Sequence, residues 1–109
     1  MTRIELSKGK AIDVKSLVEY SAASIVSKTL VDTKAGTITL FAFDNGQGLS
    51  EHTASYDAVV QIIDGEAEIT LGGNAICAGE GDMVIMPANV PHALRAVKRF
   101  KMLLTMIRA

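Results

Sequence analysis

A chain of 109 residues that is 49% hydrophobic and 21% charged has the composition of an ordinary globular protein and the length of one domain. A net charge of −1, with no basic stretch interleaved with aromatic residues, argues against nucleic acid as a partner. The single cysteine excludes an internal disulfide and a cysteine-rich zinc site, and no apolar run approaches the roughly 18 residues of a membrane span. We therefore expect a single domain over residues 1–109, a cytoplasmic location and no membrane partner.

The first third of the chain carries two competing patterns. Apolar residues between Leu17 and Leu30 are spaced as on one face of a helix, whereas residues 25–31 taken alone have the pattern of a strand. We predict the strand for residues 25–31, preceded by a single turn of helix near residues 15–20.

The rest of the chain is typical of short strands separated by turns that contain glycine. Residues 37–43 are rich in β-branched and aromatic residues and stop at a turn signal, Asp44-Asn45-Gly46. Residues 58–63 and 66–71 flank Asp64-Gly65, which predicts a hairpin with a two-residue turn. Further strands are predicted at residues 74–77, 83–86, 92–97 and 100–107. Many short strands at spacings of about 8–12 residues indicate an all-β sandwich or barrel.

Several side chains that could carry chemistry have ordinary structural explanations. Cys77 is expected to be a small buried or half-buried residue rather than a nucleophile. The basic run at residues 98–101 is expected to solvate a turn, and Asp57 is expected to cap one. The methionines of the apolar strands are expected to fill the core: Met83, Met86, Met102 and Met106.

Two spacings in the second half of the chain resemble those of the cupins, which are small jelly-roll barrels. The family's first motif places a glycine five residues before His-x-His and ends on a glutamate and a glycine; the second places a glycine five residues before a proline, with a histidine beyond it. Six residues match these positions: Gly46, His52, Gly65, Gly81, Pro87 and His92. The resemblance implies an all-β double-stranded β-helix of the RmlC-like, conserved-barrel type, with a motif-bearing core over about residues 37–107.

The chain departs from the family's pattern at four positions. The second histidine of His-x-His falls on Ala54, and the glutamate falls on Ala58. In the second motif, Asn89 replaces a glycine and Ala96 replaces an asparagine. Only His52 and His92 remain of the four ligand positions that the resemblance implies, which predicts a degenerate metal site.

Strand alternation predicts that the motif positions face one mostly apolar pocket. Its expected lining is His52, Ala54, Ala58, Val60, His92 and Leu94. Four-ligand structural zinc sites contribute roughly 10–16 kcal/mol, and on equal shares two ligands keep about half, which corresponds to dissociation constants of roughly millimolar to micromolar. Glu51 and Asp57 fit poorly as third ligands, because alternation places both out of phase with the motif positions. We expect either no cofactor or one weakly bound divalent metal (Zn, Fe, Mn or Ni) on His52 and His92.

Three classes of function stay open, and no catalytic residue is assigned. The preferred hypothesis is a protein that binds a small organic molecule in the barrel. The alternative is a metal-dependent enzyme, dioxygenase-like or isomerase-like, that uses His52 and His92 on a small organic acid or sugar derivative. A second alternative is a dimeric structural or interaction protein. A homodimer is expected in any case, because the resemblance implies it and an open sandwich has strand edges that pairing would cover.

Overall fold

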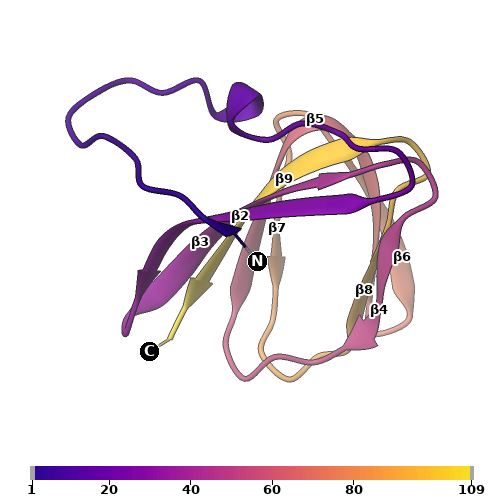
Figure 1. The fold of residues 1–109 in the computed structure, drawn as a ribbon. Helices are drawn as coiled ribbons and strands as arrows, with labels where there is room; N and C mark the ends of the chain where they lie inside the picture. The colour runs from indigo at the N-terminus through magenta and orange to yellow at the C-terminus, as the bar shows by residue number, and fades with distance from the viewer. Residues whose placement is uncertain (1, 109) are drawn as a thin grey trace.

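Nine strands and one short 3-10 turn make up the structure, a computed structural model that describes residues 2–108 (Figure 1). In chain order the elements are β1 (Thr2–Arg3), the 3-10 turn η1 (Val14–Leu17), β2 (Ile25–Thr33), β3 (Gly36–Phe43), β4 (Gly48–His52), β5 (Ala58–Leu71), β6 (Asn74–Gly79), β7 (Met83–Met86), β8 (His92–Arg95) and β9 (Phe100–Ile107). Among these described residues, no helix is long and apolar enough to cross a membrane.

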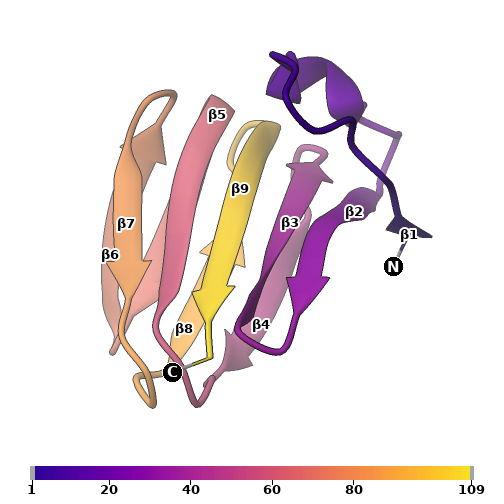
Figure 2. The ribbon, with the colours of Figure 1, turned by 90° about the vertical axis from the view of Figure 1, so that its left-hand side faces the viewer.

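The strands form two faces that share the long strand β5. One face, which we call the first sheet, has the order β1-β2-β3-β9-β5-β7, and the other, the second sheet, has the order β4-β8-β5-β6. Figure 2 shows the first sheet in front, with β8 and β4 behind it. All described pairings are antiparallel except that of β1 with β2. The predicted all-β jelly-roll barrel is confirmed.

Strand β5 corrects the prediction of a hairpin at Asp64-Gly65. The chain does not reverse there, because β5 runs without interruption for 14 residues from Ala58 to Leu71. Its first part pairs with β7 and its second part with β6, and its register against β9 shifts between Ile62 and Asp64. Gly65 has a φ of 73°, and a Cβ at this position would clash with the carbonyl oxygen of Arg99. The glycine therefore bends one strand from the first sheet into the second instead of closing a turn.

Most other predicted elements are present near their predicted bounds. The helical turn near residues 15–20 and the strand at residues 25–31 correspond to η1 and β2, and residues 83–86 coincide with β7. Strand β4 was not predicted separately, because most of its side chains are exposed and it lacks an alternating apolar pattern.

The expectation of a buried or half-buried Cys77 is wrong. Strand β6 lies at an edge of the second sheet, where it pairs with β5. Ala78, paired with Ala67, is the residue that faces the core, and Cys77 is exposed. The alternation of side chains along β6 therefore places the thiol on the solvent side.

Two groups of buried residues stabilise the fold. The main core lies between the two sheets and includes Phe43 and Phe100, whose rings stack with centroids 4.4 Å apart. The second core lies on the outer side of the first sheet, where Val18 packs with Leu40 and Ala42. We call residues 14–20 the N-terminal strap, because they cover this part of the sheet (Figure 1). The strap explains why the apolar residues of the first third follow neither a continuous helix nor a continuous strand.

Candidate functional site

The two histidines of the chain meet at the ends of β4 and β8. His52 and His92 are paired residues of these antiparallel strands. Leu49 pairs with Leu94, so three residue steps on β4 match two steps on β8, and the register shift between Leu49 and His52 is a bulge. The imidazole rings lie 4.3 Å apart between centroids at an interplanar angle of 70°. The sequence prediction that the two histidines converge agrees with this geometry.

The backbone determines which ring nitrogens carry hydrogen. The Nδ1 atom of His52 lies 2.8 Å from the carbonyl oxygen of Ser50, and Nδ1 of His92 lies 3.2 Å from that of Val90. A carbonyl oxygen only accepts, so each Nδ1 must donate its hydrogen to the chain two residues earlier. In a neutral ring, Nε2 is then left with a free lone pair.

The two Nε2 atoms face each other across 3.1 Å, which is a hydrogen-bonding distance. Two bare lone pairs at this separation repel, so the contact requires a positive group between or beside the nitrogens. A proton, a hydrogen-bond donor or a metal cation satisfies this requirement. The geometry of His52 and His92 can therefore accommodate a species that accepts electron pairs, of which a shared proton is the simplest.

The environment of the pair is asymmetric. His92 is 3% exposed and lies two residues before buried Leu94, on the same face of β8, which places its ring on the inner face of the second sheet. His52 is exposed. The pair thus has one fixed, buried member and one member that solvent and solutes reach directly.

The other predicted pocket residues lie in two different environments. Ala58, Val60 and Leu94 belong to the main core and are at most 4% exposed. Ala54 follows the end of β4 and is partly buried. The alternation that predicted a shared face for His52 and Ala54 therefore ends at His52, where the strand ends.

The loops that follow β4 and β7 are fastened to each other beside the histidine pair. The N–H of Asn89 donates to the carbonyl of Ala54 at 2.8 Å, and the N–H of Ala88 donates to Oδ1 of Asp57 at 2.8 Å. Asp57 thus secures a loop through its carboxylate, in agreement with the expectation of a structural role. Next to these bonds, a cavity of about 320 Å³ is lined by Ser55, Tyr56, Asp57, Ala88 and Ile107.

Asn89 adopts a left-handed backbone conformation at a position where the second motif of the family has a glycine. This residue stands where the family has a glycine, and its φ is 63°. The turn therefore requires the left-handed conformation, which asparagine tolerates better than most residues other than glycine. The loop before His92 keeps the conformation that the motif requires.

The residues present do not fit a metal site with three or four protein ligands. Within residues 2–108, no three His, Cys, Asp or Glu side chains come together as a candidate metal site. Ala54 and Ala58 offer no metal-ligating atom at the two remaining motif positions.

The methionines of the apolar strands differ in their burial. Met86 and Met102 fill the core as expected, whereas Met83 is 60% exposed at the edge of the first sheet.

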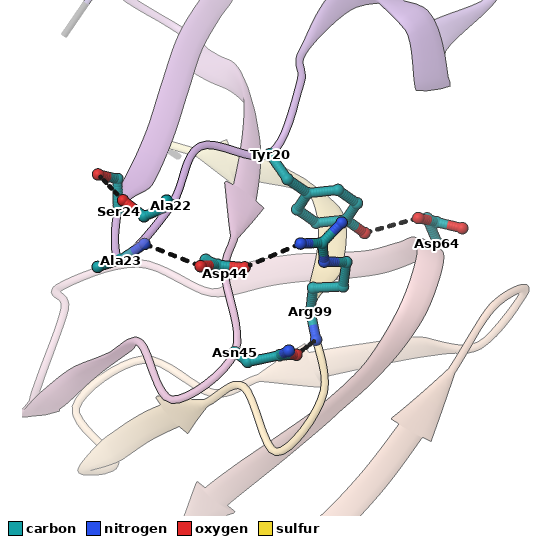
Figure 3. Close-up of polar contacts among 8 residues, drawn as sticks. All are labelled: Tyr20, Ala22, Ala23, Ser24, Asp44, Asn45, Asp64 and Arg99. Carbon is teal, nitrogen blue, oxygen red and sulfur yellow. Dashed lines mark hydrogen bonds and ion pairs between the residues drawn. The ribbon is translucent and has the colours of Figure 1, made fainter.

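A second cluster of polar residues lies where the strap meets the barrel (Figure 3), and sequence reasoning did not find it. The hydroxyl of Tyr20 donates to Oδ2 of Asp64 at 2.6 Å. The guanidinium of Arg99 lies 4.6 Å from the centre of the Tyr20 ring and 3.3 Å from Oδ1 of Asp44. Lys101 contributes a second cation, 5.1 Å from the same ring. Two residues of the basic run at 98–101, Arg99 and Lys101, thus anchor the strap through cation–π contacts with Tyr20.

The electrostatics of this cluster agree with an anchoring role. Burial, together with the hydrogen bond to Asp64, raises the pKa of Tyr20 far above its usual range. The backbone N–H groups of Ala23 and Asn45, followed by Arg99, lower the pKa of Asp44. The cluster therefore favours a neutral tyrosine and an ionised Asp44 near neutral pH. No sequence motif links these residues, which are up to 81 positions apart along the chain (Tyr20 to Lys101).

The two-sheet architecture and the motif-matched histidine pair define the class of the protein as a small jelly-roll barrel. The family model of the cupin domain matches residues 39–107, which is more than half of the chain. The chain therefore belongs to the cupin family. A search of the curated proteins gave no significant match.

Solved structures extend the similarity to the whole chain. A conserved protein of unknown function from Streptococcus pyogenes is 35% identical with a TM-score of 0.91, over 100% of this chain and 96% of that one. A cupin superfamily protein from Desulfitobacterium hafniense is 30% identical with a TM-score of 0.88, over 94% of each chain. An RmlC-like cupin from Desulfovibrio desulfuricans is 26% identical with a TM-score of 0.78, over 90% of this chain and 95% of that one. These matches establish the barrel and the family but assign no substrate.

Proposed function

We propose that this cupin domain binds a small organic molecule at the His52–His92 pair and that its metal site is degenerate. The observation that carries the proposal is the 3.1 Å separation of two Nε2 atoms whose opposite ring nitrogens are both engaged with backbone carbonyls. This arrangement orients two acceptor nitrogens toward one point at the end of the barrel.

The tautomers restrict the ligand to one chemical class. Since both Nδ1 atoms already donate to the chain, a ligand that engages the neutral pair must present a hydrogen-bond donor to Nε2. Hydroxyl, ammonium and protonated carboxyl groups meet this requirement, whereas a carboxylate, which only accepts, does not. We infer that the ligand carries a hydroxyl or amine close to an apolar body, because Leu94, a residue of the main core, lies two positions from His92 on the same face of β8.

The exposure of the two rings gives each a separate role. Exposed His52 admits the ligand, and buried His92 holds it in a fixed direction through a ring fastened to Val90. A hydrogen bond to a neutral donor contributes about 0.5–1.5 kcal/mol net, so two such bonds give only modest affinity on their own. Contact with apolar atoms of the ligand must supply the remainder of any affinity better than millimolar.

The presence of only two histidines makes the test direct. Their ¹⁵N ring resonances are assigned with His52→Ala and His92→Ala variants and followed during titration with catechol, with glucose and with acetate. We expect a donor probe to shift the Nε2 signals of both rings and acetate at pH 8 to leave them unchanged. The shifts disappear in His52→Ala but persist in Tyr56→Phe, a control that alters a hydroxyl at the neighbouring cavity. Acetate binding without donor binding contradicts the proposal.

A metal-dependent enzyme is the second candidate, and one specific observation favours it. Histidines that bind metals usually donate their other ring N–H to a carbonyl or carboxylate, as both rings do here. A divalent ion on His52 and His92 would take its remaining ligands from water or substrate, and it would act there as a Lewis acid. Metal analysis of untagged protein, followed by titration with Fe(II), Mn(II), Zn(II) and Ni(II), separates the candidates. Stoichiometric metal that is lost in His92→Ala would place this candidate first.

A further inference from the structure

A cavity of about 320 Å³ lies at the end of the barrel where β9 ends and β5 begins. The register of the first sheet brings three segments together there, because Ala58 at the start of β5 pairs with Met106 on β9 and with Met86 on β7. The chain just beyond these pairs supplies the lining, which consists of Ser55, Tyr56, Asp57, Ala88 and Ile107. Ligand pockets commonly enclose about 300–1,000 Å³, so this cavity suits a small molecule.

Asp57 brings a negative charge to the cavity that no lining residue neutralises. Its Oδ1 atom accepts the N–H of Ala88 at 2.8 Å, which holds the carboxyl group in one orientation. Within the part of the chain that the structure describes, Asp57 forms no ion pair, and its Oδ2 atom accepts no hydrogen bond. A carboxylate accepts hydrogen bonds at both oxygens, so Oδ2 remains available to a donor from outside the chain.

The other walls of the cavity are aromatic or aliphatic. Tyr56 is 38% exposed and Ile107 is 57% exposed, so both side chains have surface that a ligand can cover. Covering such surface is favourable in proportion to the apolar area removed from water. The face of a tyrosine ring also attracts cations. The cavity therefore combines one carboxylate with apolar atoms and an aromatic ring.

This combination selects an organic cation over the other charged ligands. An anion would be repelled by Asp57. A hard metal ion requires several oxygen ligands, and no three His, Cys, Asp or Glu side chains of residues 2–108 come together as a metal site. An ammonium group, in contrast, needs one carboxylate and forms a charge-assisted hydrogen bond with it. We propose that the cavity binds a small organic amine whose ammonium group pairs with Asp57 and whose apolar body lies against Tyr56 and Ile107.

The site is held in place before a ligand arrives. Besides the bond from Ala88 to Asp57, the N–H of Asn89 donates to the carbonyl of Ala54 at 2.8 Å, so two hydrogen bonds join the loops that form the walls. A preorganised site loses less conformational entropy on binding. The cavity is also separate from the ligand site proposed above, because neither histidine lines it. The two proposals are therefore independent.

Titration with benzylamine at pH 7, followed through backbone amide resonances, tests the site. We expect millimolar benzylamine to shift the amides of Asp57, Ala88 and Ile107. Benzyl alcohol has the same shape without the charge, so it should bind at least about 10-fold more weakly. The same titration in His52→Ala should give an unchanged dissociation constant, because the histidine pair takes no part.

Three variants locate the ammonium group and the apolar body. Asp57→Asn keeps an oxygen acceptor for Ala88 but removes the charge, so the dissociation constant of benzylamine should rise at least about 10-fold. Ala88→Leu extends a lining side chain into the cavity and should abolish the shifts. Glu51→Gln is the matched control, because it removes an exposed carboxylate that does not line the cavity, and it should bind like wild type.

Four results would overturn the proposal. They are the absence of shifts at the lining residues, equal affinities for benzylamine and benzyl alcohol, wild-type affinity in Asp57→Asn, and undiminished binding in Ala88→Leu. Shifts that vanish in His52→Ala would assign benzylamine to the histidine pair instead. That result would reject the amine cavity and leave the proposed function of the pair intact.

Discussion

Replacing Ala54 by histidine tests whether this barrel has the geometry of a metal site at a position where the family's first motif has a histidine. Ala54 is two residues beyond His52, and its carbonyl is fixed by the N–H of Asn89 at 2.8 Å. The backbone at residue 54 is therefore held against the loop that leads to His92. The variant tests whether a third imidazole at residue 54 reaches the two whose Nε2 atoms already lie 3.1 Å apart.

The expected gain follows from the energy of a single ligand. Four-ligand structural zinc sites contribute roughly 10–16 kcal/mol, so one ligand accounts for about 2.5–4 kcal/mol on equal shares. At about 1.4 kcal/mol for each tenfold change, Ala54→His should tighten zinc binding by about 60-fold to 700-fold. Three protein ligands with one open position is also the arrangement of catalytic zinc sites.

Competition with a chromophoric zinc chelator measures this gain over the required range. Thr53→His is the matched control, because it adds the same side chain at the preceding residue, which is exposed. We expect the control to bind zinc no more tightly than wild type, and we expect His92→Gln in the Ala54→His background to cancel the gain. Equal affinities for Ala54→His and Thr53→His would show that residue 54 does not face the histidine pair, which would refute the reasoning.

Three further predictions concern stability. Gly65→Ala should lower the free energy of unfolding by about 3 kcal/mol or more in urea titrations, because the added Cβ meets the carbonyl of Arg99 at a positive φ. Tyr20→Phe should cost about 1 kcal/mol at pH 7 through the lost bond to Asp64. Folding raises the pKa of Tyr20, so ionisation of this tyrosine should not affect wild-type stability below pH about 10 and should lower it above that pH. The Tyr20→Phe variant should lack this alkaline loss of stability. Asn89→Gly should change the melting temperature little, whereas Asn89→Val should lower it clearly, because φ is 63° there.

The strands could be predicted because their signals are local. Residues 83–86 are an apolar run bounded by turn residues, and residues 100–107 are a mostly apolar run between arginines; they coincide with β7 and β9. The error at Asp64-Gly65 has a physical cause, since an Asp-Gly pair and a positive φ serve a hairpin turn and a bend within a strand equally well. The two outcomes are distinguished by Arg99, which lies in the connection between β8 and β9 and whose carbonyl approaches Gly65. This contact joins residues that are far apart in the sequence.

The candidate site could be predicted only in part, for a similar reason. Motif spacing identified His52 and His92, because each lies at the family's distance along the chain from a motif glycine, Gly46 for the first and Gly81 for the second. The direction of each Nδ1 hydrogen depends on the carbonyls of Ser50 and Val90, and therefore on the bulge in β4, which leaves no mark in the sequence. The chemistry of the pair, two acceptors rather than two donors, thus appears only with the folded backbone.

The retained and lost motif positions separate the requirements of the fold from those of the chemistry. Gly65 and Asn89 both have positive φ values, which are backbone conditions that the barrel needs whether or not a metal is bound. Ala58, in contrast, is 3% exposed within the core, where an ionised carboxylate without a metal would be strongly destabilising. In a barrel without a metal, an alanine at residue 58 is more stable than the family's glutamate, which would be buried there without a partner. The same argument does not apply to His52 and His92, because each ring already donates to a carbonyl and costs the fold little. Two histidines beside two alanines are therefore what the proposed recognition of a hydrogen-bond donor without a metal requires.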